Sequence, residues 1–147
     1  MDIDKFWMQQ ALLEAKKAFE KDEVPIGAII VRNGKIIARA HNQVEQLQDV
    51  TAHAELLAIT SASNALNQKY LWDCTIYVTL EPCPMCAYAL NLAQVSRVVF
   101  AAPDHQKGYR TFNPNLLHES IEVHEGVLKE EAQSLIKEFF QLKRLIE

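Results

Sequence analysis

The chain has 147 residues, of which 49% are hydrophobic and 23% are charged, and its formal net charge at pH 7 is −4. This length and composition predict one globular domain over residues 1–147 and exclude a fibrous or low-complexity protein. The acidic balance excludes the strongly basic footprint of a general nucleic-acid binder, although it leaves room for a local basic patch.

The first predicted elements are a helix and a β-hairpin. Apolar residues recur at spacings of three and four over residues 4–21, which indicates an amphipathic helix that cannot continue through Pro25. The apolar, β-branched run at residues 26–31 is typical of a buried strand. Asn33 and Gly34 predict a two-residue type I′ turn, because both positions need positive φ, and residues 35–40 form the returning antiparallel strand.

The second half of the sequence alternates between helices and strands. We expect a helix over residues 51–66 with Thr51 as its N-cap, and a helix opened by prolines over residues 82–93. This order predicts an α/β fold with a mixed five-stranded sheet and helices on both faces. The remaining predicted elements are strands at 75–80, 95–101 and 121–123, a loop at 104–118 and a final helix at 128–146.

The residues that indicate chemistry are His53, Cys83 and Cys86. The two cysteines form a Cys-x-x-Cys pair at the start of one predicted helix, and His53 stands at the start of another. A helix N-terminus carries partial positive charge and free N–H groups, which favour the thiolate form that binds metals. Two thiolates and one imidazole supply three ligands to Zn²⁺, and tetrahedral zinc then keeps a fourth position for water, as catalytic sites do.

Glu55 distinguishes a catalytic site from other zinc sites. Positions i and i+2 of a helix point about 200° apart, so His53 and Glu55 cannot chelate one metal side by side. Both can, however, reach a site that lies beyond the N-terminus of their helix. We therefore expect Glu55 to lie beside the metal without binding it and to act as the catalytic proton shuttle.

Two other kinds of site are compatible with a Cys-x-x-Cys pair. A thioredoxin-like redox pair would follow the first strand of the fold, which this pair does not do. A structural zinc site would need a fourth protein ligand, and Cys74 is the nearest remaining thiol. A cysteine in that position is usually a small buried hydrophobe, so we favour the three-ligand catalytic site.

The same residues form a known signature. His53-Ala54-Glu55 followed by Pro82-Cys83-Pro84-Met85-Cys86 resembles the H-x-E…P-C-x-x-C pattern of the zinc-dependent cytidine/adenosine deaminase superfamily. Residues 23–28, 49–55, 77–83 and 139–140 resemble the bacterial tRNA-specific adenosine deaminases, and the resemblance covers nearly the whole chain. It implies a three-layer α/β/α cytidine-deaminase-like fold, a homodimer, and hydrolytic deamination of adenosine to inosine at the wobble position of a tRNA anticodon loop.

The resemblance also implies roles for individual residues. His53, Cys83 and Cys86 bind one Zn²⁺ per chain, and Glu55 is the proton shuttle. Asn42, just past the second predicted strand, matches a family position that contacts the target nucleoside. Without the resemblance, Asn42 is equally explained as a turn-forming residue that ends a strand.

The sequence departs from this family at residues 105–114, where a run of small residues is usual. Here Lys107 and Arg110 alternate with Tyr109 and Phe112, as phosphate contact and base stacking require. A solvated loop held by two anchoring aromatic side chains explains the same pattern almost as well. The departure makes the identity of the substrate the open point.

Three functions therefore remain. Deamination of adenosine in tRNA is favoured by the extent of the resemblance, which includes basic residues of the last helix such as Lys137 and Arg144. A deaminase of free nucleobases or nucleosides, with guanine as the first candidate, fits the acidic charge and the altered loop. A noncatalytic zinc- or RNA-binding module would have no need of Glu55 beside the metal.

The number of cysteines and the first residues of the chain indicate the cellular compartment in which the protein is expected. Three cysteines cannot all pair within one chain, which favours a reducing environment. Residues 1–4 are acidic where a signal peptide is basic, and no apolar run approaches the ~18 residues of a membrane span. We therefore expect a cytoplasmic protein without membrane contact.

Overall fold

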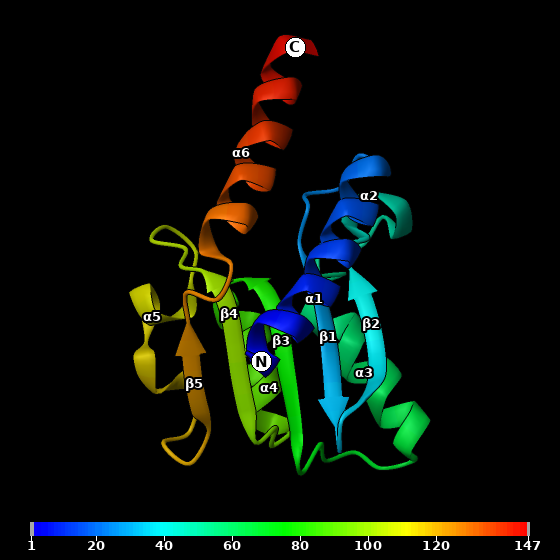
Figure 1. Cartoon of the computed structure of the whole chain (residues 1–147), viewed down its shortest axis with the longest axis vertical. Coiled ribbons are helices and arrows are strands. Elements are labelled where there is room, and N and C mark those ends of the chain that lie inside the picture. Colours follow the sequence, from blue (N-terminus) through cyan, green and yellow to red (C-terminus); the bar gives the residue numbers. More distant parts are fainter. Residues whose placement is uncertain (1, 147) are drawn as a thin grey trace.

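A five-stranded sheet in the order β2-β1-β3-β4-β5 forms the centre of the computed structural model, which describes residues 2–146 (Figure 1). β1 pairs antiparallel with β2 and β3, whereas the β3–β4 and β4–β5 pairs are parallel, so the predicted mixed sheet is confirmed. The strands are β1 (Gly27–Arg32), β2 (Lys35–His41), β3 (Cys74–Leu80), β4 (Arg97–Ala102) and β5 (Glu122–Glu125).

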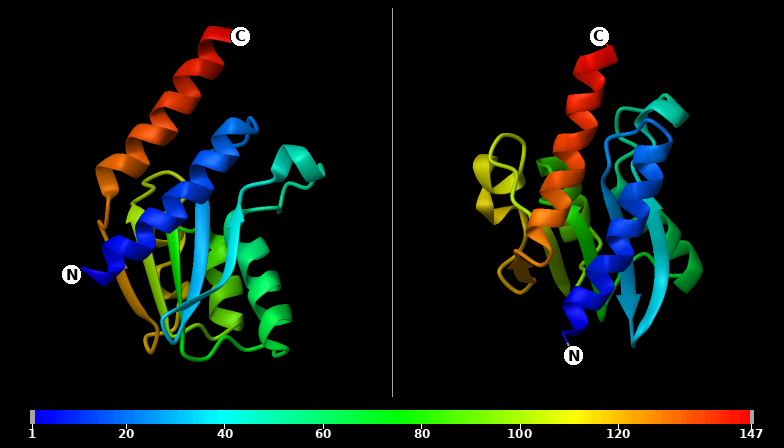
Figure 2. Two further views of the ribbon diagram at one scale, coloured as in Figure 1. Left: turned by 45° about the vertical axis from the view of Figure 1, so that its right-hand side comes forward. Right: turned by 45° about the horizontal axis from the view of Figure 1, so that its top comes forward.

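Helices cover both faces of this sheet, which gives the predicted three-layer α/β/α arrangement (Figure 2). α1 and α6 pack on one face, where Met8 and Ala132 join one buried apolar cluster with residues of β1 and β4. α3 and α4 pack on the other face around Ala58 and Leu90. The helices are α1 (Ile3–Glu20), α2 (Val44–Leu47), α3 (Ala54–Leu66), α4 (Pro84–Leu92), α5 (Tyr109–Phe112) and α6 (Lys129–Ile146).

Two local features shape the β1–β2 hairpin and its contact with α1. Asn33 and Gly34 have φ values of 51° and 71°, as the predicted β1–β2 hairpin requires. Gly27 lies under α1, where a Cβ atom would collide with the backbone of Ala11 and Ala15. The absence of a side chain at Gly27 therefore lets α1 lie directly on β1.

The prediction that Thr51 is the N-cap of the following helix is wrong. The backbone N–H and the hydroxyl of Thr51 both donate to the Asp49 carboxylate, at 2.8 and 2.7 Å, in a turn that precedes the helix. α3 begins at Ala54, and the Ala54 N–H donates to the side-chain oxygen of Asn42 at 2.8 Å. A residue twelve positions earlier in the chain thus supplies the cap.

The segment predicted as a loop, residues 104–118, contains regular structure. It includes α5 and a short 3-10 helix at Pro114–Leu116. Tyr109 is buried in the core on the α3–α4 face, so the segment is anchored to the rest of the fold. Every helix formed by residues 2–146 is too short or too polar to cross a membrane.

Candidate active site

Two helix N-termini bring the predicted zinc ligands together. His53 precedes α3, and Cys83 precedes α4. Nδ1 of His53 lies 3.6 Å from Sγ of Cys83 and 3.5 Å from Sγ of Cys86, and the three ligand atoms lie within 4.8 Å of one another. Sulfur and nitrogen bound tetrahedrally to one zinc ion would be roughly 3.5 Å apart, so the arrangement fits that metal.

The charges of these side chains favour a cation between them. The pKa of Cys83 is lowered to about 4, chiefly because the Cys86 thiol and then the His53 ring hydrogen-bond to its thiolate. The pKa of Cys86 is raised by the same hydrogen bond to Cys83 and by burial. A cation bound between the two sulfurs would hold both cysteines as thiolates.

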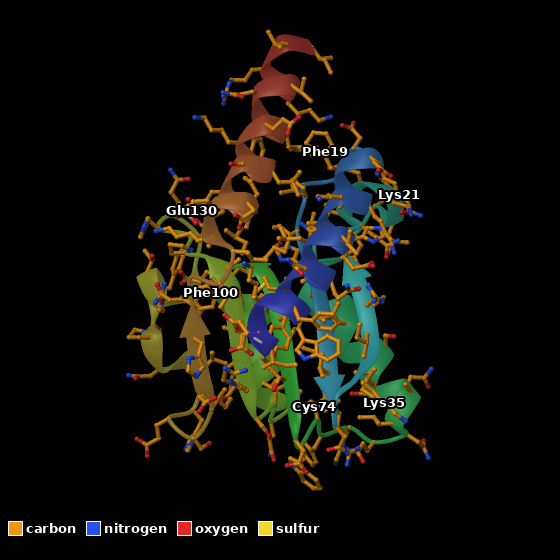
Figure 3. All side chains as sticks on the ribbon, viewed as in Figure 1. Phe19, Lys21, Lys35, Cys74, Phe100 and Glu130 are labelled. Atoms are coloured by element: carbon orange, nitrogen blue, oxygen red, sulfur yellow. The ribbon has the colours of Figure 1, made fainter. Side chains whose placement is uncertain are left out.

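The cluster of possible metal ligands has three members. Among residues 2–146, the only cluster that could hold a metal is His53, Cys83 and Cys86. Cys74 is buried at the start of β3, at the end of the sheet opposite Lys21, which lines the cavity described below (Figure 3). Residues 2–146 thus place no fourth ligand of a structural zinc site in this cluster, and Cys74 is a core residue, as predicted.

Glu55 lies in the first turn of α3 and is only 4% exposed. It lines the same cavity as His53 and Cys83 but is outside the cluster of possible ligands. Burial, the largest influence, raises the pKa of its carboxyl group to about 7. Its role as the proton shuttle stays a prediction, and its position beside the ligands is the position which that role requires.

Asn42 also lines this cavity and is 6% exposed. Because its side-chain oxygen accepts the Ala54 N–H, the amide NH₂ is the group left to donate to a ligand. The residue thus serves as a structural cap while it faces the cavity. Its contact with substrate stays a prediction.

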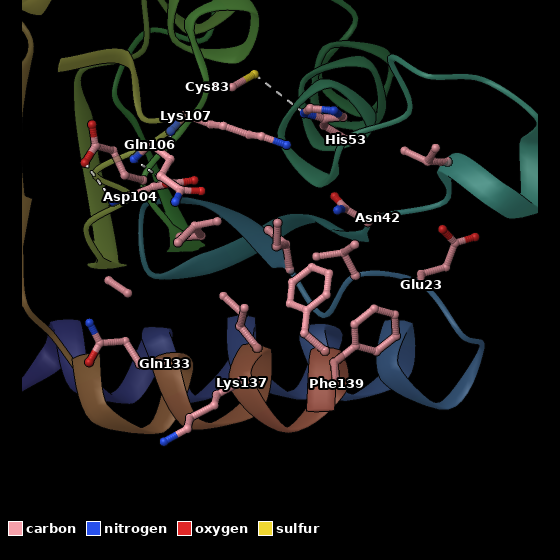
Figure 4. A pocket seen from close by; sticks show the side chains of 18 of the residues that line it. Glu23, Asn42, His53, Cys83, Asp104, Gln106, Lys107, Gln133, Lys137 and Phe139 are labelled. Carbon is pink, nitrogen blue, oxygen red and sulfur yellow. Dashed lines mark hydrogen bonds between the residues drawn. The ribbon is translucent and has the colours of Figure 1, made fainter. Parts of the chain in front are cut away.

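The cavity has a volume of about 1540 Å³ and is open to solvent. Cys83, His53 and Asn42 lie on one side of it, and α6 contributes Gln133 and Lys137 on the other (Figure 4). Five basic residues line the cavity, namely Lys21, Lys107, Lys137, Lys143 and Arg144. Six acidic residues line it as well: Asp22, Glu23, Glu45, Glu55, Glu81 and Asp104.

The basic residues of the cavity differ in whether they form an ion pair within the protein. Lys143 donates to Asp22 at 2.6 Å and lies 5.6 Å from the centre of the Phe139 ring. Within residues 2–146, no ion pair involves Lys107, Lys137 or Arg144. These three cations are available to a polyanionic ligand.

Glu81, for which no role was predicted, lines the cavity and is 4% exposed. Burial alone would raise the pKa of its carboxyl group, but hydrogen bonds from Arg110 and from two backbone N–H groups outweigh burial, and the pKa is lowered. The available signal was an acidic residue directly before the Pro82-Cys83 motif, in an otherwise apolar stretch. The interpretation of Arg110 as a phosphate contact is therefore wrong, because Arg110 pairs with Glu81 and Glu125.

Of the other residues of this segment that were predicted to contact RNA, one is buried and two are accessible. Tyr109 is 3% exposed and packs in the core, so it is not available for base stacking. Phe112 is 65% exposed, and Lys107 lines the cavity. The alternation of charge and aromatics in the sequence thus combines an anchor, an internal ion pair and two accessible side chains.

Comparison with known sequences identifies relatives over the whole chain. Residues 1–102 match the family described as the cytidine and deoxycytidylate deaminase zinc-binding region. The tRNA-specific adenosine deaminase of Aquifex aeolicus is 51% identical over 143 residues, which cover 95% of each chain. The enzyme of the same name from Bacillus subtilis is 50% identical over 96% of this chain and 91% of its own.

Solved structures share the fold. A tRNA:A34 deaminase, studied for A-to-I editing at the wobble position of transfer RNA, superposes with a TM-score of 0.81 and 42% identity over 87% of this chain and 96% of its own. Guanine deaminase from Nitrosomonas europaea superposes with a TM-score of 0.80 and 26% identity over 90% and 81%. The chain belongs to the cytidine and deoxycytidylate deaminase zinc-binding family and is a zinc-dependent deaminase.

Proposed function

We propose that this chain converts adenosine to inosine at the wobble position of a tRNA anticodon loop. The observation that carries the proposal is the cavity itself, whose lining joins Glu55, His53 and Cys83 to the basic residues Lys107, Lys137 and Arg144. Relatives at 50% and 51% identity that are named tRNA-specific adenosine deaminases support the same substrate. The overall reaction replaces the exocyclic amine of adenine by oxygen from water and releases ammonia.

His53, Cys83 and Cys86 would hold one Zn²⁺ ion. When bound, zinc supplies Lewis-acid activation of water at neutral pH. The chain contributes the partial positive charge of the α4 N-terminus, which favours the thiolate of Cys83.

Glu55 moves the protons of the reaction. Its carboxylate takes a proton from the attacking water and delivers it to the purine ring nitrogen, and a second proton then reaches the departing amine. Burial in the first turn of α3 fixes the side chain in the cavity and keeps bulk water from competing for the proton.

Asn42 orients the base. Its side-chain oxygen is held by the Ala54 N–H, so the amide NH₂ has a fixed direction and can donate to an acceptor of the nucleoside. This contact would align the reacting carbon with Glu55. An orienting hydrogen bond of this kind lowers the barrier by holding the reacting groups in position.

The size of the cavity and the cations in its lining that form no ion pair within residues 2–146 favour RNA over a free base. A volume of about 1540 Å³ exceeds the ~300–1,000 Å³ of typical small-molecule pockets. Lys107, Lys137 and Arg144 would contact phosphates of the nucleotides next to the target. An anticodon loop presents its bases without a complementary strand, so moving the adenine into the cavity costs little.

One assay tests this proposal. The zinc-loaded protein is incubated with an anticodon stem-loop that has adenosine at the wobble position, and inosine is measured by nuclease digestion and chromatography. Ammonia release from guanine, cytosine and adenine is measured in parallel. We expect rapid inosine formation and slow reaction of the free bases, because phosphate contacts supply the energy that positions the base. An inert stem-loop beside a rapidly reacting free base would overturn the proposal.

A second candidate is deamination of a free base, with guanine first. Two guanine deaminases support it: the Nitrosomonas europaea structure described above, and the Bacillus subtilis structure, which is 39% identical over 65% of this chain with a TM-score of 0.63. Turnover that responds little to salt would accompany guanine deamination, because no phosphate is bound. The assay above distinguishes the two candidates.

We also propose that the protein is a homodimer, with α4 in the contact between subunits. Met85, Tyr88 and Leu92 recur at spacings of three and four on α4 and are 38%, 49% and 60% exposed. Clustered exposed apolar side chains of this kind are typical of protein contacts. Sedimentation should show a dimer, and Tyr88→Glu should shift it toward the monomer. A monomeric wild-type protein would contradict the proposal.

The proposed substrate also indicates the cellular compartment of the protein. Because tRNA is used in the cytoplasm, we place the protein there. The free Cys83 and Cys86 support this placement, since a reducing compartment keeps both available as ligands.

A further inference from the structure

We propose that Arg110 is a positioning residue that acts through Glu81 to hold the cavity-lining residues 104–107 in place for the RNA substrate. The inference rests on the proposed function for its activity measurements, whereas its structural part can be tested without RNA. It concerns the segment in which this sequence departs from the family pattern.

The carboxylate of Glu81 connects the two ends of the segment 104–110, which contains the cavity-lining residues 104–107. One oxygen accepts the backbone N–H of Asp104 at 3.1 Å and a guanidinium N–H of Arg110 at 2.9 Å. The other oxygen accepts the backbone N–H of Arg110 at 3.1 Å. One buried side chain thus fixes the residue that starts the segment and the residue that ends it.

Backbone contacts hold the segment close to the zinc ligands. The N–H of Gly108 donates to the carbonyl oxygen of Asp104 at 2.9 Å, and a Cβ atom on Gly108 would collide with the Glu81 carboxylate. The N–H of Tyr109 donates to the carbonyl oxygen of Pro82 at 2.8 Å. Because Pro82 directly precedes Cys83, the segment is tied to the start of the ligand-bearing α4.

The side chain of Arg110 is held by partners within the protein. Its guanidinium pairs with Glu125 on β5 as well as with Glu81, and it lies 4.9 Å from the centre of the Phe100 ring. Arg110 does not line the cavity, whereas residues 104–107 do. Figure 4 shows Asp104, Gln106 and Lys107 among the lining side chains. The positive charge of Arg110 is therefore already paired with carboxylates of the protein and is not free to bind a phosphate.

The energetic consequence follows from the burial of Glu81. Removing Arg110 would leave a 4%-exposed carboxylate without its charged partner. An uncompensated buried charge is strongly unfavourable, so the carboxylate would move toward water and release the backbone N–H groups that it holds. Residues 104–107 would then shift on the cavity wall, and even a small displacement of positioning groups lowers the rate of the chemical step.

The activity test compares Arg110→Ala with Lys107→Ala in the zinc-loaded full chain. For Arg110→Ala with an anticodon stem-loop, we expect kcat to fall by about tenfold or more, because the base is misplaced once bound. The Kd for the stem-loop should stay within about twofold, and its salt dependence should match the wild type. Lys107→Ala should instead raise Kd and reduce the slope of log Kd against log salt by about one, with kcat maintained.

Two further variants control for charge and shape. Arg39→Ala also removes an arginine paired with a buried carboxylate, that of Glu14, but neither residue lines the cavity. It should leave kcat and Kd near the wild-type values. Arg110→Lys keeps the charge but loses the planar guanidinium, so it should restore part of kcat. Zinc content and melting temperature are measured for every variant, which separates misplacement from unfolding.

Amide hydrogen exchange on the RNA-free protein tests the structural part. Exchange at residues 104–110 should be faster in Arg110→Ala, because the Asp104 and Arg110 amides lose the acceptor held by the ion pair. It should be unchanged in Lys107→Ala and Arg39→Ala. Unchanged exchange in Arg110→Ala, or a reduced salt slope like that of Lys107→Ala, would overturn the inference. If exchange is faster in Arg110→Ala but the wild-type protein does not react with the stem-loop, the inference is supported and the proposed function is overturned.

Discussion

The side-chain oxygen of Asn42 accepts the backbone N–H of Ala54 at 2.8 Å, so the residue that follows β2 also caps the N-terminus of α3. This hydrogen bond joins the hairpin to the helix end that carries His53 and Glu55. Asn42 therefore has two separable functions, a structural one through its oxygen and a proposed substrate contact through its NH₂ group. Substitutions that keep one group and remove the other can distinguish them.

Asn42→Ala removes both groups, and Asn42→Asp keeps only the acceptor. We expect Asn42→Ala to lower the free energy of unfolding by about 1 kcal/mol, because the helix loses its cap. Asn42→Asp should unfold near the wild-type midpoint, since Asp caps equally well. Both should lower kcat/KM by about tenfold, the value of one hydrogen bond to a neutral group. Full activity of Asn42→Asp would leave Asn42 with a structural role alone.

Glu55→Gln preserves the shape of the side chain and removes its ability to carry a proton. Deaminase activity should fall by about 10²- to 10⁴-fold, the usual contribution of a general acid–base group. Zinc content and folding should be retained, because Glu55 lies outside the ligand cluster. Metal analysis and single-turnover kinetics check both points. Loss of zinc would make Glu55 a ligand, and near-normal turnover would assign the proton transfer to another group.

Removal of a ligand should be distinguishable from removal of a core cysteine. Cys83→Ala and Cys86→Ala should each lose most of the zinc and should melt at a lower temperature, because a metal that binds only the folded chain stabilises it. Cys74→Ala should retain close to one zinc per chain, although loss of a fully buried side chain should cost about 1 kcal/mol. Metal loss from Cys74→Ala would contradict the three-ligand site.

Local patterns predicted most of the fold. The turn at Asn33 and Gly34 depends on backbone angles that few residues adopt, and the strands follow from short apolar, β-branched runs. Thr51 illustrates the limit, because it is a good N-cap residue in a plausible position. The actual cap is a side chain from β2's end, and a contact of that kind leaves no local trace in the sequence.

In the candidate site, too, features with a local sequence pattern were predictable and contacts between distant residues were not. His53, Cys83 and Cys86 were predictable because metal chemistry dictates residue types and spacing. The pairing of Arg110 was not, because its partner Glu81 lies 29 positions away, and an arginine beside aromatics is equally consistent with RNA contact. Function-bearing motifs are thus readable from the sequence, whereas the allocation of individual charges requires the tertiary structure.

Asp4 and Arg97 form an ion pair that makes stability depend on pH. The Asp4 carboxylate accepts hydrogen bonds of 2.7 and 2.6 Å from the Arg97 guanidinium and one of 2.7 Å from the Tyr77 hydroxyl. These contacts join the start of α1 to β3 and β4. The Arg97 hydrogen bond, the largest influence, holds the pKa of Asp4 below its ordinary value of 3.8.

The sign of the effect follows from that lowered pKa. The unfolded chain binds a proton at Asp4 more readily than the folded chain, so the stabilisation is present above pH ~4 and is lost as the pH falls through the folded-state pKa. Asp4→Asn should cost about 1 kcal/mol at pH 7, a value reduced for partial exposure. The difference between variant and wild type should shrink below pH ~4, since the wild-type carboxylate is then protonated as well.

Urea unfolding of both proteins between pH 3 and pH 7 measures this difference, in which the protonation of the zinc ligands cancels. Glu122→Gln is the matched control, because Glu122 also pairs with Arg97 at 2.6 Å but its side chain is 61% exposed. Its effect should be smaller at every pH, since an exposed pair is screened by water. A cost of Asp4→Asn that stays constant from pH 7 to pH 3 would show that the ionised carboxylate is not the stabilising group.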